Sequence, residues 1–447
     1  MEIGKLTVSG IEVLTILNMT ITAALGQHAQ MELECIMKAD KVQEYMDKVT
    51  KQDKINVSES NKVLFSGHMI SADCNVNQKY AQMKILVKSG SYLLDKEKHT
   101  KSYQDINQTY WDVMESKASC RLYGEERNVE SILLQYRETD WAFIKRIASK
   151  CQMPIYPDMI SDNTVIYCGI DSNASAKEIH VLDAELMKHS DIITYRLSSD
   201  DFFKVGEVIN YQGKKLYISE VECKMEQAGF HAVYCAKTMN DMKCREEYLY
   251  DMAGAALEGR IIDVAGDKVK VHLQVDATQD TQKAYWFPFS TMQSSSDGSG
   301  WYYMPEIGDC VKVCIPGWEE QGAFAVSAVS TYQAESGSED RMADTNVKYM
   351  RNPSGKEIQL SPDSINADGG GNASLMSMKT DGSIILASKT SLQIEASETI
   401  EIIAEAGIEM EASEVIDIKA DTSGELLLDE NGDIRQLGGQ VNINSEE

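Results

Sequence analysis

The chain has 447 residues, 43% of them hydrophobic, which is enough for roughly two to four domains with cores of their own. Its 70 acidic and 43 basic side chains give a formal net charge of -27, so no basic excess is available to displace counterions from nucleic acid. This balance excludes nucleic acid as a partner.

The sequence carries no targeting or metal-binding pattern. The N-terminal residues MEIGKLTVSGIEV lack a basic segment followed by an apolar core. No apolar run reaches the roughly 18 residues that a membrane-spanning helix needs. The ten cysteines form no CxxC pair, and the seven histidines show no HxH or HExxH spacing. We therefore expect synthesis in the cytoplasm without a signal peptide, and neither a metal nor another cofactor.

Residues 1–100 are expected to form a first β-barrel. Runs such as MELECIM and YAQMKILVKSGSYLL alternate apolar and polar residues, with Gly, Asn or Asp between the runs. Residues 101–195 are expected to be mixed. Within them, residues 102–116 carry apolar side chains at helical spacings of three and four, which predicts a helix.

A strand followed by a capped helix is predicted within residues 131–158. The strand ends near Gln135 and Tyr136, and Thr139 or Asp140 can cap the helix that follows. The apolar side chains of this helix are Trp141, Phe143, Ile144 and Ile147. The simplest interpretation is a capped helix that packs on a barrel.

Residues 196–245 are expected to form a second small barrel, and residues 246–256 a linker. The acidic, Met-containing stretch 239–256 is interpreted as helical. From residue 257 the pattern becomes β again, so no further helical segment is predicted there.

Residues 257–332 contain five short alternating strands with glycines at their corners, which indicates a Greek-key barrel of the OB type. The last of these strands is expected to run from Ala325 to Val329. Barrels of this type often bind oligonucleotides or sugars, and the rings of residues 301–303 could stack on bases. Because no basic groove accompanies them, we interpret these rings as core residues or contacts between subunits.

Residues 333–351 are a polar linker, and residues 352–447 are expected to form a β-structured rod. An eight-residue pattern recurs from Ser383 to Thr422, as SIILASKT, SLQIEASE, TIEIIAEA, GIEMEASE and VIDIKADT. The sixth position of each octad is small, and the second and fourth are large and apolar. These apolar residues are Ile384, Leu386, Leu392, Ile394, Ile400, Ile402, Ile408, Met410, Ile416 and Ile418.

Alternation of this kind makes short strands with one apolar face, which must stack on copies of themselves to bury that face. Since each chain offers one narrow apolar face, the favoured closure is three chains wound about a common axis. The outward positions are mostly acidic, which keeps the rod solvated. An amphipathic array of hairpins and a single-chain solenoid remain alternatives.

Several segments resemble the VgrG and phage late-control tail hub family. Residues 131–158 resemble its signature QY-x-E-[ST]-D-x-x-F-x-x-R-[IL], through Gln135, Tyr136, Glu138, Thr139, Asp140, Phe143, Arg146 and Ile147. Residues 201–238 look like the second small barrel of this family. Residues 257–332 are similar to its OB domain at the base of the spike, through Gly259, Trp286, Pro288, Pro305, Gly308 and Asp309.

The resemblance implies a mainly β fold with some α, in which two hub β-barrels with inserted helices precede an OB-fold barrel. A C-terminal needle follows, in which three chains intertwine as a β-helix. In that family, three chains form the central hub and spike of a contractile injection machine, such as a phage tail, a tailocin or a type VI secretion system. The hub adapts a six-fold tube to a three-fold needle, and the needle transmits force to pierce the target envelope.

The resemblance also implies partners. They are two further copies of the chain, a tail tube ring or tube initiator above the hub, baseplate wedge proteins, and a PAAR-type tip or an effector at the needle end. The target cell envelope would be a transient partner. The chain would be part of an assembled particle and would be delivered outward on contraction.

Two other functions are open from the residues alone, a β-helical tail-fibre adhesin and a hydrolase of cell wall or carbohydrate. A hydrolase needs paired carboxylates in a cleft, and Glu138 with Asp140 is the only tempting pair in the hub. We favour capping and packing roles for both. Residues 330–352 are too short to hold an inserted enzyme domain, so no enzymatic activity is predicted.

Overall fold

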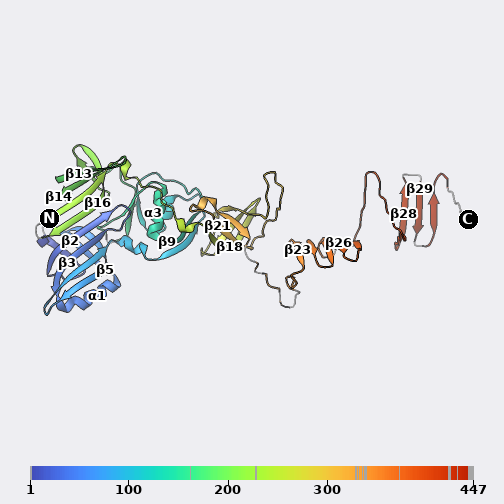
Figure 1. Cartoon of the computed structure of the whole chain (residues 1–447), viewed down its shortest axis with the longest axis horizontal. Helices are drawn as coiled ribbons and strands as arrows, with labels where there is room; N and C mark the ends of the chain where they lie inside the picture. Colours follow the sequence, from blue (N-terminus) through green and yellow to red (C-terminus); the bar gives the residue numbers. More distant parts are fainter. Residues whose placement is uncertain are drawn as a thin grey trace. The chain divides into compact units, whose positions relative to one another are not determined.

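The computed structural model describes residues 3–161, 163–226, 229–327, 330, 332–334, 336, 340–371, 373–420, 424–429 and 431–440. The chain divides into two compact units, Met1–Thr331 and Tyr332–Glu447. The fold is mainly β with some α, as expected (Figure 1). Within the described residues, no helix is long and apolar enough to cross a membrane.

Strands from both expected hub barrels lie in one twelve-stranded sheet of the first unit. Its path runs β1-β4-β5-β6-β3-β2-β16-β17-β14-β13, and β12 and β15 attach beside β16. The antiparallel pair β2 and β16 joins the two groups of strands (Figure 1). The strands are β1 (Leu6–Ser9), β2 (Thr15–Ala24), β3 (Gln30–Lys38), β4 (Lys54–Glu59), β5 (Lys62–Val76), β6 (Tyr80–Lys88), β12 (Lys177–Glu178), β13 (Val181–His189), β14 (Ile192–Ser199), β15 (Val208–Tyr211), β16 (Lys214–Glu226) and β17 (Gly229–Lys237).

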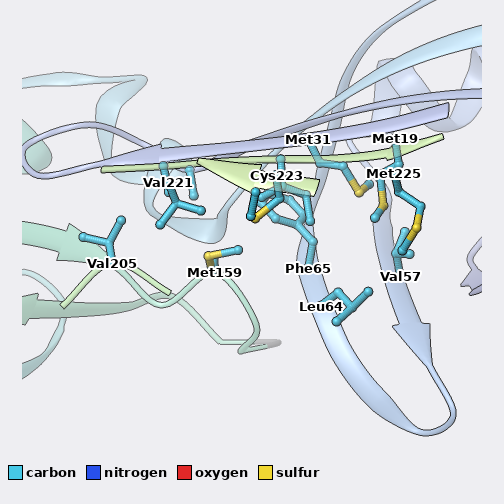
Figure 2. Packing of buried hydrophobic residues seen from close by; sticks show 14 of the residues in the cluster. Met19, Met31, Val57, Leu64, Phe65, Met159, Val205, Val221, Cys223 and Met225 are labelled. Carbon is cyan, nitrogen blue, oxygen red and sulfur yellow. The ribbon is translucent and has the colours of Figure 1, made fainter. Parts of the chain in front are cut away.

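One hydrophobic core serves this whole sheet. Period-two alternation turns every second side chain inward, as in β3, where Met31, Leu33, Cys35 and Met37 are all fully buried. Figure 2 shows labelled side chains from β2, β3, β4, β5 and β16 meeting in this core. The helix α1 (Val42–Lys51), which the β-rich interpretation of residues 1–100 missed, packs against β5 and buries Tyr45.

The middle of the first unit contains α2 (Tyr110–Glu115), α3 (Asp140–Lys150) and an antiparallel ribbon of β7 (Lys98–Tyr103) and β9 (Leu133–Thr139). A three-stranded sheet of β10 (Ile155–Pro157), β11 (Val165–Cys168) and β8 (Ser119–Leu122) completes it.

The predicted helix over residues 102–116 is wrong in its first half. Residues up to Tyr103 belong to β7, and the Asp105 side chain then accepts a hydrogen bond from the Asn107 amide in a turn. The helix begins only after Thr109, whose side chain forms a capping box with Asp112.

The predicted OB-type barrel corresponds to a five-stranded sheet in the order β20-β19-β18-β21-β22. A bridge between Phe289 and Ala325 brings its two outer strands together. Its strands are β18 (Ala255–Ala265), β19 (Lys268–Leu273), β20 (Trp286–Pro288), β21 (Cys310–Ile315) and β22 (Phe324–Ser327). The last two residues of the predicted closing strand, 328 and 329, lie outside the described residues.

The expected helical segment 239–256 is not an α-helix. It holds two single 3-10 turns, Asn240–Met242 and Tyr250–Met252, and its last residues already belong to β18. Met242 and Met252 are buried, so the segment is anchored by isolated apolar side chains rather than by a helical stripe.

The second unit contains two antiparallel sheets. The first has the order β23-β24-β25-β26-β27 and the second β28-β29-β30. Their strands are β23 (Lys348–Arg351), β24 (Glu357–Leu360), β25 (Ser364–Asp368), β26 (Ser374–Lys379), β27 (Ile384–Ser388), β28 (Val415–Ala420), β29 (Gly424–Asp429) and β30 (Ile434–Leu437). Thr422, the last residue of the octads, lies outside the described residues.

Residues 391–414, all described, contain no helix or strand within the single chain. The chain bends at the last two residues of each of the first four octads, at 389–390, 397–398, 405–406 and 413–414. These bends repeat the period of the sequence pattern. They come directly after the small sixth residue of the octad.

Candidate assembly surfaces

A buried cluster of charges is built around Arg146 on α3. Its guanidinium donates from Nε and Nη2 to the two carboxylate oxygens of Glu138, at 3.0 and 2.8 Å. Nη1 donates to Oε1 of Glu320 at 2.9 Å, and Nη2 also donates to the Leu134 carbonyl at 2.7 Å. Arg146 is 4% exposed, Glu138 7% and Glu320 2%, so the cluster is closed to water.

The charges in this cluster compensate one another. Burial disfavours the charge on Arg146, but hydrogen bonds to Glu138 and the charge of Glu320 outweigh this effect, and the pKa of Arg146 is raised. Lys150 lies 3.8 Å from Glu320 and supplies a second positive charge. Since Glu320 belongs to the OB barrel, between β21 and β22, the cluster ties that barrel to α3 and β9.

A second set of buried hydrogen bonds joins β7 to the OB barrel. The amide and hydroxyl of Ser102 donate to the two carboxylate oxygens of Asp276, at 2.9 and 2.5 Å. The side chain of Gln104 donates to the Val271 carbonyl at 3.1 Å and accepts from the Tyr285 amide at 3.2 Å. Two β9-segment side chains, Ile132 and Leu134, also pack in the barrel's core. The joint is therefore both polar and apolar.

All the residues of the hub signature lie around this joint. Gln135 is fully buried and donates to the Glu138 carbonyl and to Asp140. Thr139 caps α3 by accepting from the Ala142 amide at 3.1 Å, which confirms the predicted cap. The remaining three are Phe143, which is fully buried against Tyr103, Ile147, which is fully buried, and Tyr136, which packs against the core of the OB barrel. Sequence reasoning missed Glu320, Lys150, Ser102 and Asp276, which no local motif marks.

Glu138 and Asp140, the two carboxylates considered as a hydrolase pair, both form ion pairs. Glu138 binds Arg146, and Asp140 pairs with Lys117 at 3.0 Å while accepting from Gln135. Neither faces a water-filled cleft with a free partner carboxylate, so the geometry favours the structural roles that we expected for them.

Ser91, His28 and Asp95 form a chain that resembles a nucleophile, a base and its orienting acid. Ser91 Oγ lies 2.8 Å from His28 Nδ1, and His28 Nε2 lies 3.3 Å from Asp95 Oδ2. However, Ser91 is 1% exposed, and its hydroxyl also bonds Ser89. The ring of His28 packs on Trp141 of α3, with centroids 4.4 Å apart. Because no substrate could reach this serine, the three side chains serve packing between α3 and the first strands.

The OB signature residues shape turns and close approaches. Gly308 has a φ of +97°, and the Asp309 side chain accepts from the Glu306 amide at 2.9 Å. A Cβ on Gly259 would lie 2.4 Å from a side-chain atom of Val271 in the neighbouring strand. The Lys270 ammonium lies over the ring of Trp286. Pro288 is the last residue of β20, whereas Pro305 lies in the loop before β21.

The rings of residues 301–303 are not core residues. Trp301 is 46% exposed, Tyr302 74% and Tyr303 53%. The interpretation as a buried core is therefore wrong for them, and contact between subunits stays a prediction. Their segment lies between β20 and β21, outside the five strands of the barrel, so it is not folded inward.

The five-stranded sheet of the second unit has one continuous apolar face. The strand register places on it Met350, Ile358, Leu360, Ile365, Ala367, Met376, Met378, Ile384 and Leu386. All of them are more than one-third exposed in the single chain. On the opposite face the side chains are polar: Asn366 donates to Gln359, and Ser377 donates to Asn366. An exposed apolar face of this extent marks an interaction surface.

The octads continue this apolar face. Ile384 and Leu386, the interior positions of the first octad, lie on it directly. Of the ten predicted interior residues, all but Ile416 are exposed by half or more in the single chain. Within the described residues, no group of three or more His, Cys, Asp or Glu side chains could hold a metal ion.

No protein-family model and no curated protein sequence matches the chain. Its structure is similar to solved structures. An Escherichia coli protein, c3393, described as a component of the type VI secretion system with structural similarity to the T4 bacteriophage tail proteins gp27 and gp5, aligns with a TM-score of 0.55 at 14% identity, over 72% of this chain and 99% of that one.

Two PdpA-VgrG complexes give similar alignments. The lidless form aligns with a TM-score of 0.53 at 10% identity, over 83% of this chain and 93% of the other. The lidded Francisella form aligns with a TM-score of 0.55 at 9% identity, over 83% and 76%. The expected resemblance is thus confirmed at the level of the fold, which this chain shares with the gp27- and gp5-like type VI component and with VgrG.

Proposed function

We propose that this chain is the homotrimeric hub and spike of a contractile injection machine, with no enzymatic activity of its own. The observation that carries the proposal is the exposed apolar face of the second unit, which runs from the five-stranded sheet into the octads. A single chain leaves this face in water, whereas two further copies would bury it.

The energetic argument favours self-association. Fully burying a Leu or Ile side chain stabilises by about 1.5–3 kcal/mol, so side chains that are roughly half exposed would each contribute about 1 kcal/mol on burial. Over the face of the sheet and the octads this sum exceeds the cost of bringing three chains together. The acidic outward positions would keep the assembled rod soluble.

The first unit supports the hub role. Two groups of strands are joined through β2 and β16. If they are the two hub elements that the resemblance implies, three copies would arrange six of them with pseudo-six-fold symmetry above a three-fold needle. The buried cluster around Arg146 would pass force from the hub into the OB barrel. A tail tube ring or tube initiator would bind above the hub, wedge proteins would bind beside it, and a PAAR-type tip or effector would bind at the needle end.

In this proposal the chain acts as part of an assembled particle and meets the target envelope only when the sheath contracts. The alternative functions, a tail-fibre adhesin and a cell-wall or carbohydrate hydrolase, find less support. The carboxylates of the hub are paired, and those of the octads recur on a solvated face.

Light scattering of the purified chain tests the proposal, with and without the residues from Ser383 onward. We expect the full chain to have three times its 49.8 kDa mass, and the shortened chain to lose that stoichiometry. A monomeric full chain would contradict the proposal and would favour a single-chain solenoid. Clearing of cell-wall substrate by the purified chain in a zymogram would contradict the non-enzymatic role.

A further inference from the structure

The three-stranded sheet of residues 415–437 departs from the octad pattern. β28 is the last octad, but the chain then reverses and pairs β29 against β28, and β30 against β29. Ile416 lies opposite Leu428, and Ile418 opposite Leu426. The run of octads is therefore followed by an antiparallel sheet that is built within one chain (Figure 1).

The two faces of this sheet differ in chemistry. One face carries the octad interior positions Ile416 and Ile418 and, apart from Gln436, the apolar residues Leu426, Leu428 and Ile434. We call this set the apolar end face. The other face carries the charged residues Asp417, Lys419, Glu425 and Arg435 together with Val415, Leu427 and Leu437, and Lys419 bridges Asp417 and Glu425.

The apolar end face continues the interior of the octads. Ile416 and Ile418 occupy the same second and fourth positions as Ile408 and Met410 in the octad before. A surface that packs on the apolar positions of the octads would therefore also contact the apolar end face. Leu426, Leu428 and Ile434 widen that surface, although the octad pattern does not contain them.

We propose that three copies of this sheet pack through their apolar end faces and form a cap, which closes the apolar interior of the octad rod. The inference rests on the proposed trimer. It goes beyond that trimer by assigning Leu426, Leu428 and Ile434 to an interface, and by assigning the closure of the rod end to this chain itself.

A closing element would solve two physical problems of a repetitive rod, its exposed end and its weakly specified register. Terminal repeats of a stacked structure would leave apolar side chains and unpaired strand edges in water, so such structures end in atypical capping units. Octads with near-identical interiors also specify their register weakly, because a chain shifted by eight residues meets almost the same neighbours. A non-repeating sheet at the end favours one register, because a shifted chain could not join the cap.

Photocrosslinking of the full chain tests the cap with a matched pair of sites on β30. Ile434 is 66% exposed in the single chain and lies on the apolar end face, whereas Leu437 is 59% exposed and lies on the charged face. Each is replaced in turn by p-benzoylphenylalanine, and the irradiated protein is analysed on a denaturing gel. We expect adducts of two and three chain masses from position 434 and none from position 437.

A second pair of variants reports on the same faces. Leu426→Asp would place three carboxylates in the closed interior, whereas Leu427→Asp in the same strand would add them to the charged face. By hydrogen exchange, amides of residues 424–429 should lose most of their protection in Leu426→Asp and keep it in Leu427→Asp.

The outcomes separate the cap from the trimer. A trimer by light scattering that crosslinks equally from both positions, or not at all from position 434, overturns the cap and leaves the trimer intact. Equal exchange in the two aspartate variants overturns it as well. A full chain that is monomeric by light scattering overturns the proposed function and the cap together.

Discussion

Replacing Arg146 by methionine should destabilise the joint between hub and OB barrel more than any exposed ion pair does. The substitution keeps the length of the stem but removes four hydrogen bonds, two to Glu138 and one each to Glu320 and the Leu134 carbonyl. Both carboxylates stay buried, and only Lys150 at 3.8 Å remains as a cation. Removing one partner of a buried pair costs about 3–5 kcal/mol, and we expect a loss of that size.

Urea unfolding of the full chain, followed by tryptophan fluorescence and circular dichroism, measures this loss. The matched control is Lys84→Met, which breaks the exposed pair with Glu32, whose side chains are 57% and 45% exposed. Because water screens such a pair, this substitution should leave the free energy of unfolding nearly unchanged. If the loss in Arg146→Met equals that in Lys84→Met, the cluster is not a stabilising joint.

Three further predictions concern the first unit. Thr139→Ala removes the cap of α3 and the bond to Asp95, and should lower the free energy of unfolding by about 1–2 kcal/mol, whereas Thr139→Ser should recover most of it. Gly259→Ala should lower the melting temperature of the OB barrel because its Cβ would overlap the adjacent strand; Gly317→Ala, with nothing within 4 Å, should leave it unchanged. Burial lowers the pKa of His28 from 6.5, so its contribution to stability is present above that pH and is lost as the pH falls below it. In His28→Gln the urea midpoint should therefore change less between pH 7.5 and pH 5 than it does in the unsubstituted chain. An equal change in both proteins would contradict this assignment.

Local patterns of the sequence predicted the parts of the fold that depend on alternation and capping. The burial of alternate residues in β3, the cap at Thr139 and the period of the bends in residues 391–414 all follow from residues close together in the chain. Alternation also indicated which side chains share a face in β27 and β28. It did not indicate that these two octads pair within their own chain, because hairpin partners and neighbouring copies offer the same apolar face.

The sequence did not predict contacts between residues that lie far apart in the chain. Glu320 completes the cluster of Arg146 from a position 174 residues away, and its own neighbours form no motif. The helix α1 was missed because residues 1–100 were interpreted as strands throughout, although Tyr45 and Val49 have helical spacing. The prediction of a helix over residues 102–116 is wrong in its first half, because the turn at Asp105 competes with helical hydrogen bonds.

Hydrogen exchange over residues 391–414 of the full chain tests the central claim most directly. These residues have no strand partner in their own chain, so a monomer or a loose solenoid would exchange their amides within seconds to minutes. The account predicts that neighbouring chains supply the partners, and that these amides are protected by at least about 100-fold, in step with β27 and β28. Rapid exchange across residues 391–414 in a sample that keeps β27 and β28 protected would contradict an intertwined needle.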